Sequence, residues 1–347
     1  MEETSTMGFL YATLVFSFII LLLANIVWSA YNLYLFAITG VQNLLKGTTF
    51  VENVYLSTYL KWILIADLIW IISALSFMLR RKHYKTNVEL HYLTYKPIVD
   101  PKIIVIIPTY NEELIVENVI KDYQNQKYVK EVIVIDNHSS DNTVKIAKQC
   151  GAKIITKDSN KGFAHSNVVG FREALKTDAN IIVTTECDGT FSAYDIVKMT
   201  PYLDNCDMVI GTRQVQVLSE KGNQNSMFYV WGNFILAKLI QLKYFSLLHM
   251  GVVQLTDVGC AHRCIRHTAL EKIIEKFTYP NSDEVVISPS SGLFTILMTM
   301  LGIENNLKIV EVPITFRKRV GISKTQSDKK LKAIKYGLRF LWYIVSS

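Results

Sequence analysis

Two carboxylates stand close together in the stretch TTECDGTF, residues 184–191: Glu186 and Asp188, with only Cys187 between them. Residues two apart on a β-strand point to the same face, so a strand that continues through this stretch projects both carboxylates together. Mg²⁺ and Mn²⁺ prefer oxygen ligands and commonly use one or two carboxylates together with substrate phosphates. The pair therefore predicts a site for Mg²⁺ or Mn²⁺, although an acid-x-acid tripeptide is also common in solvated turns.

The segments around this pair alternate between strands and helices. KIIVIIP, bounded by Pro108, and EVIVID are apolar runs typical of buried strands, and each is followed by a segment with helical spacing. The alternation continues through AKIIT, AHSNVVGFREALKT, NIIVTT, SAYDIVKMTPYL and DMVIGTR. Nearly continuous apolar strands between helices predict an α/β fold, Rossmann-like, in which helices cover both faces of a mostly parallel sheet.

Polar residues follow five successive strands of this expected sheet. Ligands bind at the carboxyl ends of the strands in such sheets, so we expect these residues to form one ligand site. Neither G-x-G-x-x-G nor G-x-x-x-x-G-K-[ST] occurs where it is needed, which removes the usual dinucleotide and P-loop ways of holding a nucleotide. The polar residues, in strand order, are Thr109, Asn111 and Glu112; Asp136 and Asn137; Lys161; Glu186 and Asp188; and Arg213.

The first 95 residues are predicted to anchor the chain in a membrane. Two apolar segments, residues 8–28 and 62–79, are near the length of about 20 residues that crosses a bilayer. The second contains Asp67, which either has a function in the membrane or hydrogen-bonds the partner helix. The basic stretch RRKHYK follows at residues 80–85, and the positive-inside rule places it in the cytoplasm. We therefore expect two transmembrane helices and a cytoplasmic remainder of the chain.

The overall composition agrees with a membrane protein. Hydrophobic residues make up 50% of the chain, and the mean hydropathy is +0.22. The net charge of +7 is modest for this length, and we expect no nucleic-acid partner. Residues 227–250 and the end of the chain, residues 327–347, are apolar segments with lysines, which favours helices on the bilayer surface. A buried core helix is the alternative for residues 227–250.

The five cysteines are scattered, which is not the pattern of a disulfide framework. Cys260 and Cys264 form the one tight cluster, with His267 nearby. A zinc site needs about four compact ligands, so the cluster is either an incomplete metal site or a pair of buried thiols.

Seven motifs follow one another along residues 102–324: IIPTYNEE, VIDNHSSDNT, NKGFAHSNVVGFREAL, TTECDGTF, GTR, TDVGCAHRCIR and EVPITFRKRVGISK. Their series resembles the family 2 glycosyltransferases of the GT-A fold, and is most similar to the dolichyl-phosphate mannose and glucose synthases. The resemblance implies a GT-A domain over residues 96–326, between the anchor at 1–95 and an amphipathic helix at 327–347. It also implies inverting transfer of a sugar from a nucleotide sugar with a divalent cation.

The resemblance and the strand ends together assign candidate roles to individual residues. Glu186 and Asp188 are the expected metal ligands, although the family more often has Asp at the first position. Asn137 stands where the family often has a second acid, which leaves the nucleotide open. The expected nucleotide-sugar contacts are Pro108, Tyr110, Glu112, Asp136, Asn137, Lys161 and Arg213, and the expected catalytic residues are Asp188, Asp257, Arg263, Arg319 and Lys324.

The membrane segments favour a lipid acceptor, a polyprenyl or dolichyl phosphate, at the cytoplasmic face. The oxygen of such a phosphate is already an anion and needs no general base, whereas a hydroxyl of a glycan or glycolipid requires one, for which Asp257 is the best candidate. The donor is a UDP- or GDP-linked sugar in both cases. The absence of Q-x-x-R-W argues against a processive polysaccharide synthase. A non-catalytic membrane scaffold is the remaining alternative.

Overall fold

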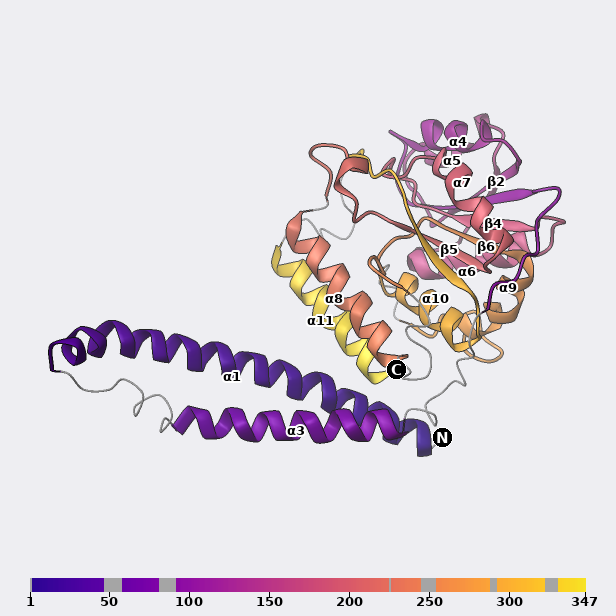
Figure 1. Ribbon diagram of the computed structural model, residues 1–347. Helices are drawn as coiled ribbons and strands as arrows, with labels where there is room; N and C mark the ends of the chain where they lie inside the picture. Colours follow the sequence, from indigo (N-terminus) through magenta and orange to yellow (C-terminus); the bar gives the residue numbers. More distant parts are fainter. Residues whose placement is uncertain are drawn as a thin grey trace. The chain divides into compact units, whose positions relative to one another are not determined.

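The computed structural model describes residues 2–46, 58–80, 92–224, 226–244, 254–287, 292–321 and 330–347. The chain divides into two compact units, residues 1–87 with 345–347 and residues 88–344. The first unit contains two long helices, and the second contains a seven-stranded sheet with its covering helices (Figure 1).

The two helices of the first unit, α1 (Glu2–Lys46) and α3 (Thr58–Arg80), pack against each other (Figure 1). The rings of Phe18 and Trp70 meet across the pair, with centroids 6.0 Å apart. Small polar side chains, Ser17 and Ser73, are buried, and small residues allow helices to approach closely. The chain thus forms helices over both of the segments predicted to cross the membrane.

Among the described residues, one of the two predicted membrane segments is long and apolar enough to span a bilayer. The stretch Phe9–Tyr31 of α1 is long and apolar enough to cross a bilayer by length and composition. The apolar stretch described in α3, Ile63–Ser76, is shorter. Asp67 lies within this stretch and is half-buried. One candidate span is therefore found, and the second span stays a prediction.

The sheet of the second unit has the strand order β3-β2-β1-β4-β6-β5-β7. Strand β6 runs antiparallel to both of its neighbours, β4 and β5, and the other pairs are parallel. Strands β4 and β5 therefore run in the same direction, and the predicted mostly parallel α/β sheet is confirmed. The strands are β1 (Ile103–Thr109), β2 (Val129–Asp136), β3 (Lys153–Thr156), β4 (Ile181–Thr184), β5 (Met208–Thr212), β6 (Arg263–Arg266) and β7 (Ile309–Pro313).

Strand β1 continues through Pro108, the residue at which the sequence analysis ended it. The ladder between β1 and β4 stops at Ile106. The Thr109 carbonyl accepts a hydrogen bond from the backbone of Asn137 on the β2 side, so the preceding Pro108 faces the side where the ladder has ended. Proline is tolerated there because no partner requires its missing N–H. The longer strand carries Thr109 and Tyr110 to the carboxyl edge of the sheet.

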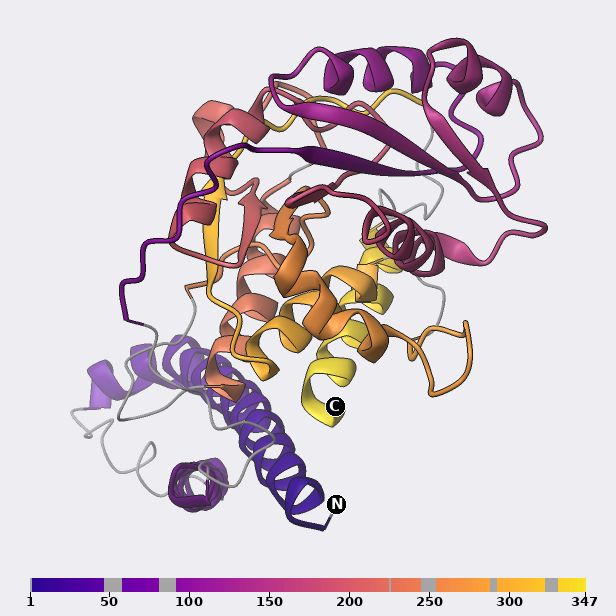
Figure 2. The same cartoon turned by 90° about the vertical axis from the view of Figure 1, so that its right-hand side faces the viewer.

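Helices cover both faces of this sheet (Figure 2). Helices α4 and α5 lie on one face, and α6 lies on the other, where it contacts β1, β2 and β4. A cluster of rings, Phe171, Phe277 and Phe294, fills the space between α6 and α10, with centroids 5.3 to 6.1 Å apart. The helices are α4 (Val116–Gln124), α5 (Thr143–Gln149), α6 (Gly162–Ala174), α7 (Asp195–Met199), α9 (His267–Ile273) and α10 (Gly292–Glu304).

Two further apolar helices, α8 (Met227–Lys243) and α11 (Lys330–Ser346), lie side by side (Figure 1). The buried Lys243 ammonium donates a hydrogen bond of 2.7 Å to the carbonyl of Ile344, which ties the ends of the two helices together. On α8, Ile240 is buried, whereas Trp231 is 57% exposed. The helix thus has one packed face and one open face, which fits the predicted surface helix better than a helix buried all round.

Candidate active site

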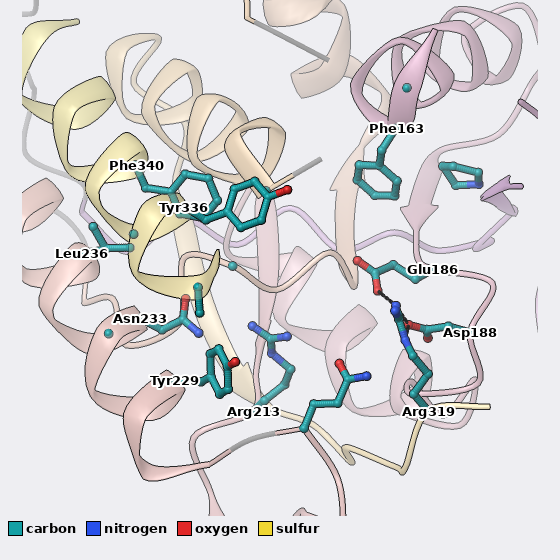
Figure 3. Close-up of a pocket in the computed structure, with 18 of the residues that line it drawn as sticks. Phe163, Glu186, Asp188, Arg213, Tyr229, Asn233, Leu236, Arg319, Tyr336 and Phe340 are labelled. Carbon is teal, nitrogen blue, oxygen red and sulfur yellow. Dashed lines mark hydrogen bonds and ion pairs between the residues drawn. The ribbon is translucent and has the colours of Figure 1, made fainter. Parts of the chain in front are cut away.

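A pocket of about 830 Å³ lies at the carboxyl edge of the sheet. Strand ends line one end of it with charged side chains, and α8 and α11 line the other end with apolar ones (Figure 3). All of the lining residues belong to the second unit of the chain. The charged lining consists of Glu112, Glu186, Asp188, Arg213 and Arg319, and the apolar lining includes Leu236, Leu239, Ile334, Phe340 and Leu341.

The acid pair follows strand β4 and does not continue it, because β4 ends at Thr184. The expectation of a strand through residues 186–188 was therefore wrong. The chain turns at Gly189, whose φ of +76° lies in the left-handed region that favours glycine. The two carboxylates still converge, because both face Arg319 (Figure 3).

Arg319 lies against both acids. Its Nε donates a hydrogen bond of 2.9 Å to Oδ2 of Asp188, and its Nη2 contacts the same oxygen. The same Nη2 is 3.7 Å from Oε2 of Glu186. The other oxygen of Asp188 accepts hydrogen bonds from the backbone N–H and the hydroxyl of Thr190, at 3.0 and 2.6 Å. A single guanidinium thus faces two carboxylates in the pocket wall.

The two acids have opposite pKa shifts. Burial opposes ionisation of Asp188, but the Arg319 guanidinium and the Thr190 hydrogen bonds outweigh it and lower the pKa of Asp188. Burial in the pocket wall, together with the neighbouring charge of Asp188, raises the pKa of Glu186 to about 8. Arg319 therefore compensates the first charge well and the second incompletely, and the site favours additional positive charge.

The pair fits Mg²⁺ or Mn²⁺ in its chemistry. It offers two adjacent carboxylates in a pocket large enough for a phosphate-bearing substrate, and Mg²⁺ usually binds one or two carboxylates plus substrate phosphates and waters. No group of three or more His, Cys, Asp or Glu residues that could hold a metal occurs in the part of the chain that the structure describes. Cys260 and Cys264 are free, buried thiols and belong to no such group.

Asp257 holds Arg213 and does not line the pocket. The guanidinium of Arg213 reaches both oxygens of Asp257, from Nε to Oδ2 and from Nη2 to Oδ1, each at 2.7 Å. The backbone N–H groups of Arg213 and Gly259 also donate to this carboxylate, at 3.1 and 3.2 Å. Asp257 is completely buried. This geometry argues against the predicted general base and favours a residue that positions Arg213.

Gly259 is needed where it lies. A Cβ atom at this position would be 2.8 Å from Oδ1 of Asn233 and 3.2 Å from Nη2 of Arg213. The first distance is shorter than real Cβ contacts and the second is tight, so a side chain here would displace the amide of Asn233 and crowd Arg213. Asn233 belongs to α8, and Figure 3 shows it on the pocket side of that helix. The absence of a side chain at Gly259 therefore allows Asn233 of α8 and Arg213 to approach each other closely.

Arg263 is part of the core and does not line the pocket. Its guanidinium donates to the carbonyls of Cys260 and Val258, at 2.9 and 3.3 Å, and to the hydroxyl of Thr299 at 2.9 Å. Burial lowers the pKa of Arg263 to about 10. Since β6 enters the sheet between β4 and β5, its first residue points into the packed interior, and the predicted phosphate contact does not fit this position.

Five of the seven expected nucleotide-sugar contacts line the pocket, namely Pro108, Tyr110, Glu112, Asn137 and Arg213. Asp136 and Lys161 do not. Asp136 is completely buried, and its carboxylate accepts hydrogen bonds from the backbone of Ser139 at 3.1 and 3.3 Å. The backbone of Lys161 donates 3.0 Å to Oδ1 of Asn137. Both residues therefore support the loops that present Asn137, and Lys324 lies outside the described residues.

The sequence analysis missed several polar residues of the pocket. Asn160 accepts a 2.6 Å hydrogen bond from Asn137, and Ser166 accepts one of 2.8 Å from the buried Lys157. Burial lowers the pKa of Lys157 to about 8, with a further contribution from Lys161. Asn233 had a signal, since it is a polar residue in the middle of an apolar helix. The other missed polar side chains of the lining are Gln224, Tyr229 and Tyr336.

Residues 104–287, more than half of the chain, match the family model described as glycosyl transferase family 2. The chain belongs to this family. It is therefore a glycosyltransferase with a GT-A-like α/β fold, as the order of motifs indicated, and its charged pocket is the candidate active site of a family 2 enzyme.

Several proteins to which this chain is similar have names that include polyprenol, dolichol phosphate or dolichyl phosphate. The polyprenol monophosphomannose synthase of Mycolicibacterium smegmatis is 25% identical over 68% of this chain and 87% of its own length. The dolichol-phosphate mannosyltransferase of Pyrococcus furiosus is 28% identical over 70% of this chain and 64% of its own length. The UDP-N-acetylglucosamine–dolichyl-phosphate N-acetylglucosaminyltransferase of Methanococcus voltae is 32% identical over 33% of this chain and 53% of its own length.

Proposed function

We propose that this protein is an integral membrane enzyme that transfers a sugar, with inversion, from a UDP- or GDP-linked donor to a polyprenyl or dolichyl phosphate at the cytoplasmic face. The observation that carries the proposal is a single pocket with a charged end at the sheet edge and an apolar end between α8 and α11. The names of the relatives, which include polyprenol and dolichyl phosphate, support the same acceptor class.

The charged end suits the diphosphate of a nucleotide sugar. A Mg²⁺ or Mn²⁺ ion held by Glu186 and Asp188 would stabilise the negative charge that develops as the diphosphate leaves. Arg213, fixed by Asp257, presents a second positive charge to the same space. Pro108, Tyr110 and Asn137 form the adjoining wall, where they can hold the nucleoside. The donor is thereby oriented for a single displacement at the anomeric carbon.

The apolar end suits a lipid acceptor. Leu236 and Leu239 of α8 line this end together with Ile334 and Leu341 of α11, and an isoprenoid chain can bury its surface against them. A lipid phosphate attacks as an anion, so the enzyme needs no general base. The burial of Asp257 against Arg213 agrees with this acceptor and argues against a hydroxyl acceptor that relies on Asp257.

The membrane anchor in this proposal keeps the domain plan expected from the sequence. Residues 1–95 anchor the enzyme, with α1 as one span and α3 as the second, and residues 96–326 carry the GT-A domain. Residues 327–347 contribute a helix that lies on the bilayer. The exposed apolar residues of α8 and α11, including Trp231 at 57% and Trp342 at 62%, suit that surface.

Transfer in reconstituted vesicles tests the proposal. The purified full chain is placed in liposomes that contain either polyprenyl phosphate or the matching polyprenol, and labelled UDP- and GDP-sugars are supplied with Mn²⁺. We expect label in the lipid extract only with polyprenyl phosphate and one donor. Equal labelling of the polyprenol would support a hydroxyl acceptor instead. Label found only in water-soluble glycan or protein would exclude a lipid acceptor.

A further inference from the structure

The guanidinium of Arg319 lies beside both acids. It contacts Oδ2 of Asp188 and is 3.7 Å from Oε2 of Glu186 (Figure 3). Two carboxylates this close repel each other unless positive charge lies beside them. In the described structure the chain supplies that charge from its own side chain.

The backbone that carries Arg319 is fixed beside the acids. The N–H of Arg317 donates 2.8 Å to the carbonyl of Thr190, and the N–H of Val320 donates 3.0 Å to the carbonyl of Asp188. Phe316 pairs with Phe191 in a β-bridge just before these bonds. The segment is therefore held on both sides of Arg319, and a change in the position of its guanidinium requires only side-chain rotation.

The contact of Arg319 itself is open to exchange. The side chain is 19% exposed and belongs to the pocket lining. Both of its contacting nitrogens share one oxygen of Asp188, while the second oxygen is bound by Thr190. The guanidinium can therefore leave the acid pair without breaking any other hydrogen bond of Asp188 and still remain within the pocket.

We propose that Arg319 is a built-in counter-cation of the acid pair, which a divalent cation displaces and which then binds a phosphate of the substrate. This inference rests on the proposed metal-dependent function. It assigns Arg319 two successive partners, the carboxylates before the metal binds and a phosphate afterwards. Metal binding without nucleotide must then overcome the Arg319–Asp188 contact, whereas a nucleoside diphosphate gives the released guanidinium a new anion.

Direct measurement of Mn²⁺ binding tests this exchange without measuring turnover. The full chain is purified in detergent, and free Mn²⁺ is followed by electron paramagnetic resonance in the absence of nucleotide. We expect the Arg319→Gln enzyme to bind Mn²⁺ about tenfold more tightly than the unaltered enzyme, since the competing charge-assisted hydrogen bonds are gone. Arg319→Lys keeps the charge without the two-pronged contact, and we expect intermediate affinity.

Arg317 provides the matched control. It lies on the same segment, but its guanidinium is 3.8 Å from Asp122 and donates 3.0 Å to Ser192, away from the acid pair. Arg317→Gln removes the same charge, and we expect a change in Mn²⁺ affinity of less than about twofold because the group is screened.

The possible outcomes separate this inference from the proposed function. Equal or weaker Mn²⁺ binding by Arg319→Gln, with clear binding by the unaltered enzyme, overturns the exchange and leaves the metal site standing. Equal tightening by Arg317→Gln also overturns it, because the effect would then be general charge. An absence of Mn²⁺ binding in every variant, with and without UDP or GDP, overturns both the exchange and the metal-dependent function.

Discussion

Two arginines line the same pocket, and each is paired with an aspartate in a different way. In the first pair, Arg213 reaches both oxygens of Asp257 at 2.7 Å each. In the second, two nitrogens of Arg319 share one oxygen of Asp188. A fork that meets both oxygens fixes the direction of the guanidinium, whereas a contact with one oxygen leaves it freer to rotate.

The surroundings of the two pairs also differ: those of Asp257 fix the contact, and those of Asp188 leave it freer. Asp257 is completely buried, and Glu311 accepts hydrogen bonds from the backbone N–H groups of Thr256 and Asp257, at 2.8 and 3.0 Å, which fixes the loop. Asp188 has a second carboxylate, Glu186, beside it in the pocket wall. The first pair is therefore a support that aims an arginine, and the second is a site that can exchange one cation for another.

The largest expected effect comes from removing the exchangeable carboxylate. Asp188→Asn keeps the shape of the side chain but removes the charge that faces Arg319. We expect transfer to fall by about a thousandfold or more at any Mn²⁺ concentration, because the metal then lacks its main ligand. Initial rates with labelled donor measure this, and near-normal turnover would sink the metal assignment. Asp178→Asn is the control, since Asp178 pairs with Lys102 on the surface and should leave the rate unchanged.

The next effect tests whether the first pair acts as one unit. We expect Arg213→Met to lower kcat/KM by about 100-fold, because a positive charge near the diphosphate is lost. Asp257→Asn should cost somewhat less. In the Arg213→Met background, Asp257→Asn should add almost nothing, because Asp257 acts through Arg213. A general base would instead lose a further factor of about 100 or more in that background.

The strand ends could be predicted from the sequence for a simple geometric reason. Parallel strands bring their carboxyl ends to one edge, so residues far apart in the chain, such as Glu112, Asn137 and Glu186, were expected to share a site, and all three line the pocket. The position within each strand end was harder to predict. Asp136 and Asn137 are neighbours in sequence and are both buried, yet only Asn137 lines the pocket.

Other parts of the site depend on contacts that a single sequence does not specify. Strand β6 has four residues and enters antiparallel between β4 and β5, which the sequence around it did not predict. The burial of Asp257 and Arg263 beside this strand was therefore not predicted either. The apolar wall is a second case. The pattern of α8 indicates a helix with apolar surface, but a bilayer, a core and a pocket all satisfy that pattern, and α8 has a buried face, an exposed face and a pocket face.

Arg263 gives a smaller effect that concerns stability rather than binding. Arg263→Met leaves the carbonyls of Cys260 and Val258 without their donor, although it also removes a buried charge. We expect a net loss of about 2 kcal/mol of unfolding free energy and a Tm lower by about 5 °C. Thermal unfolding in detergent measures the change, and the affinity for UDP or GDP should stay the same. Weaker nucleotide binding at an unchanged Tm would instead indicate that Arg263 contacts the substrate.

The smallest expected effect comes from a change at Glu311, whose hydrogen bonds go to the loop that carries Asp257. Its two oxygens accept hydrogen bonds from the Thr256 backbone and hydroxyl and from the Asp257 backbone, at 2.8, 2.7 and 3.0 Å. Glu311→Gln replaces one of those acceptors with a donor, which loosens the loop that holds Asp257. We expect kcat/KM to fall about threefold, near the lower end of the coupling between neighbouring groups.

The same change in the Arg213→Met enzyme decides how Glu311 acts. If Glu311 acts only by holding Asp257, and Asp257 only by holding Arg213, then Glu311→Gln has no further effect once the Arg213 guanidinium is gone. A threefold loss that persists in the Arg213→Met background would mean that Glu311 affects the pocket by another route, and the first pair would then not be the single rigid support that distinguishes it from Arg319 and Asp188.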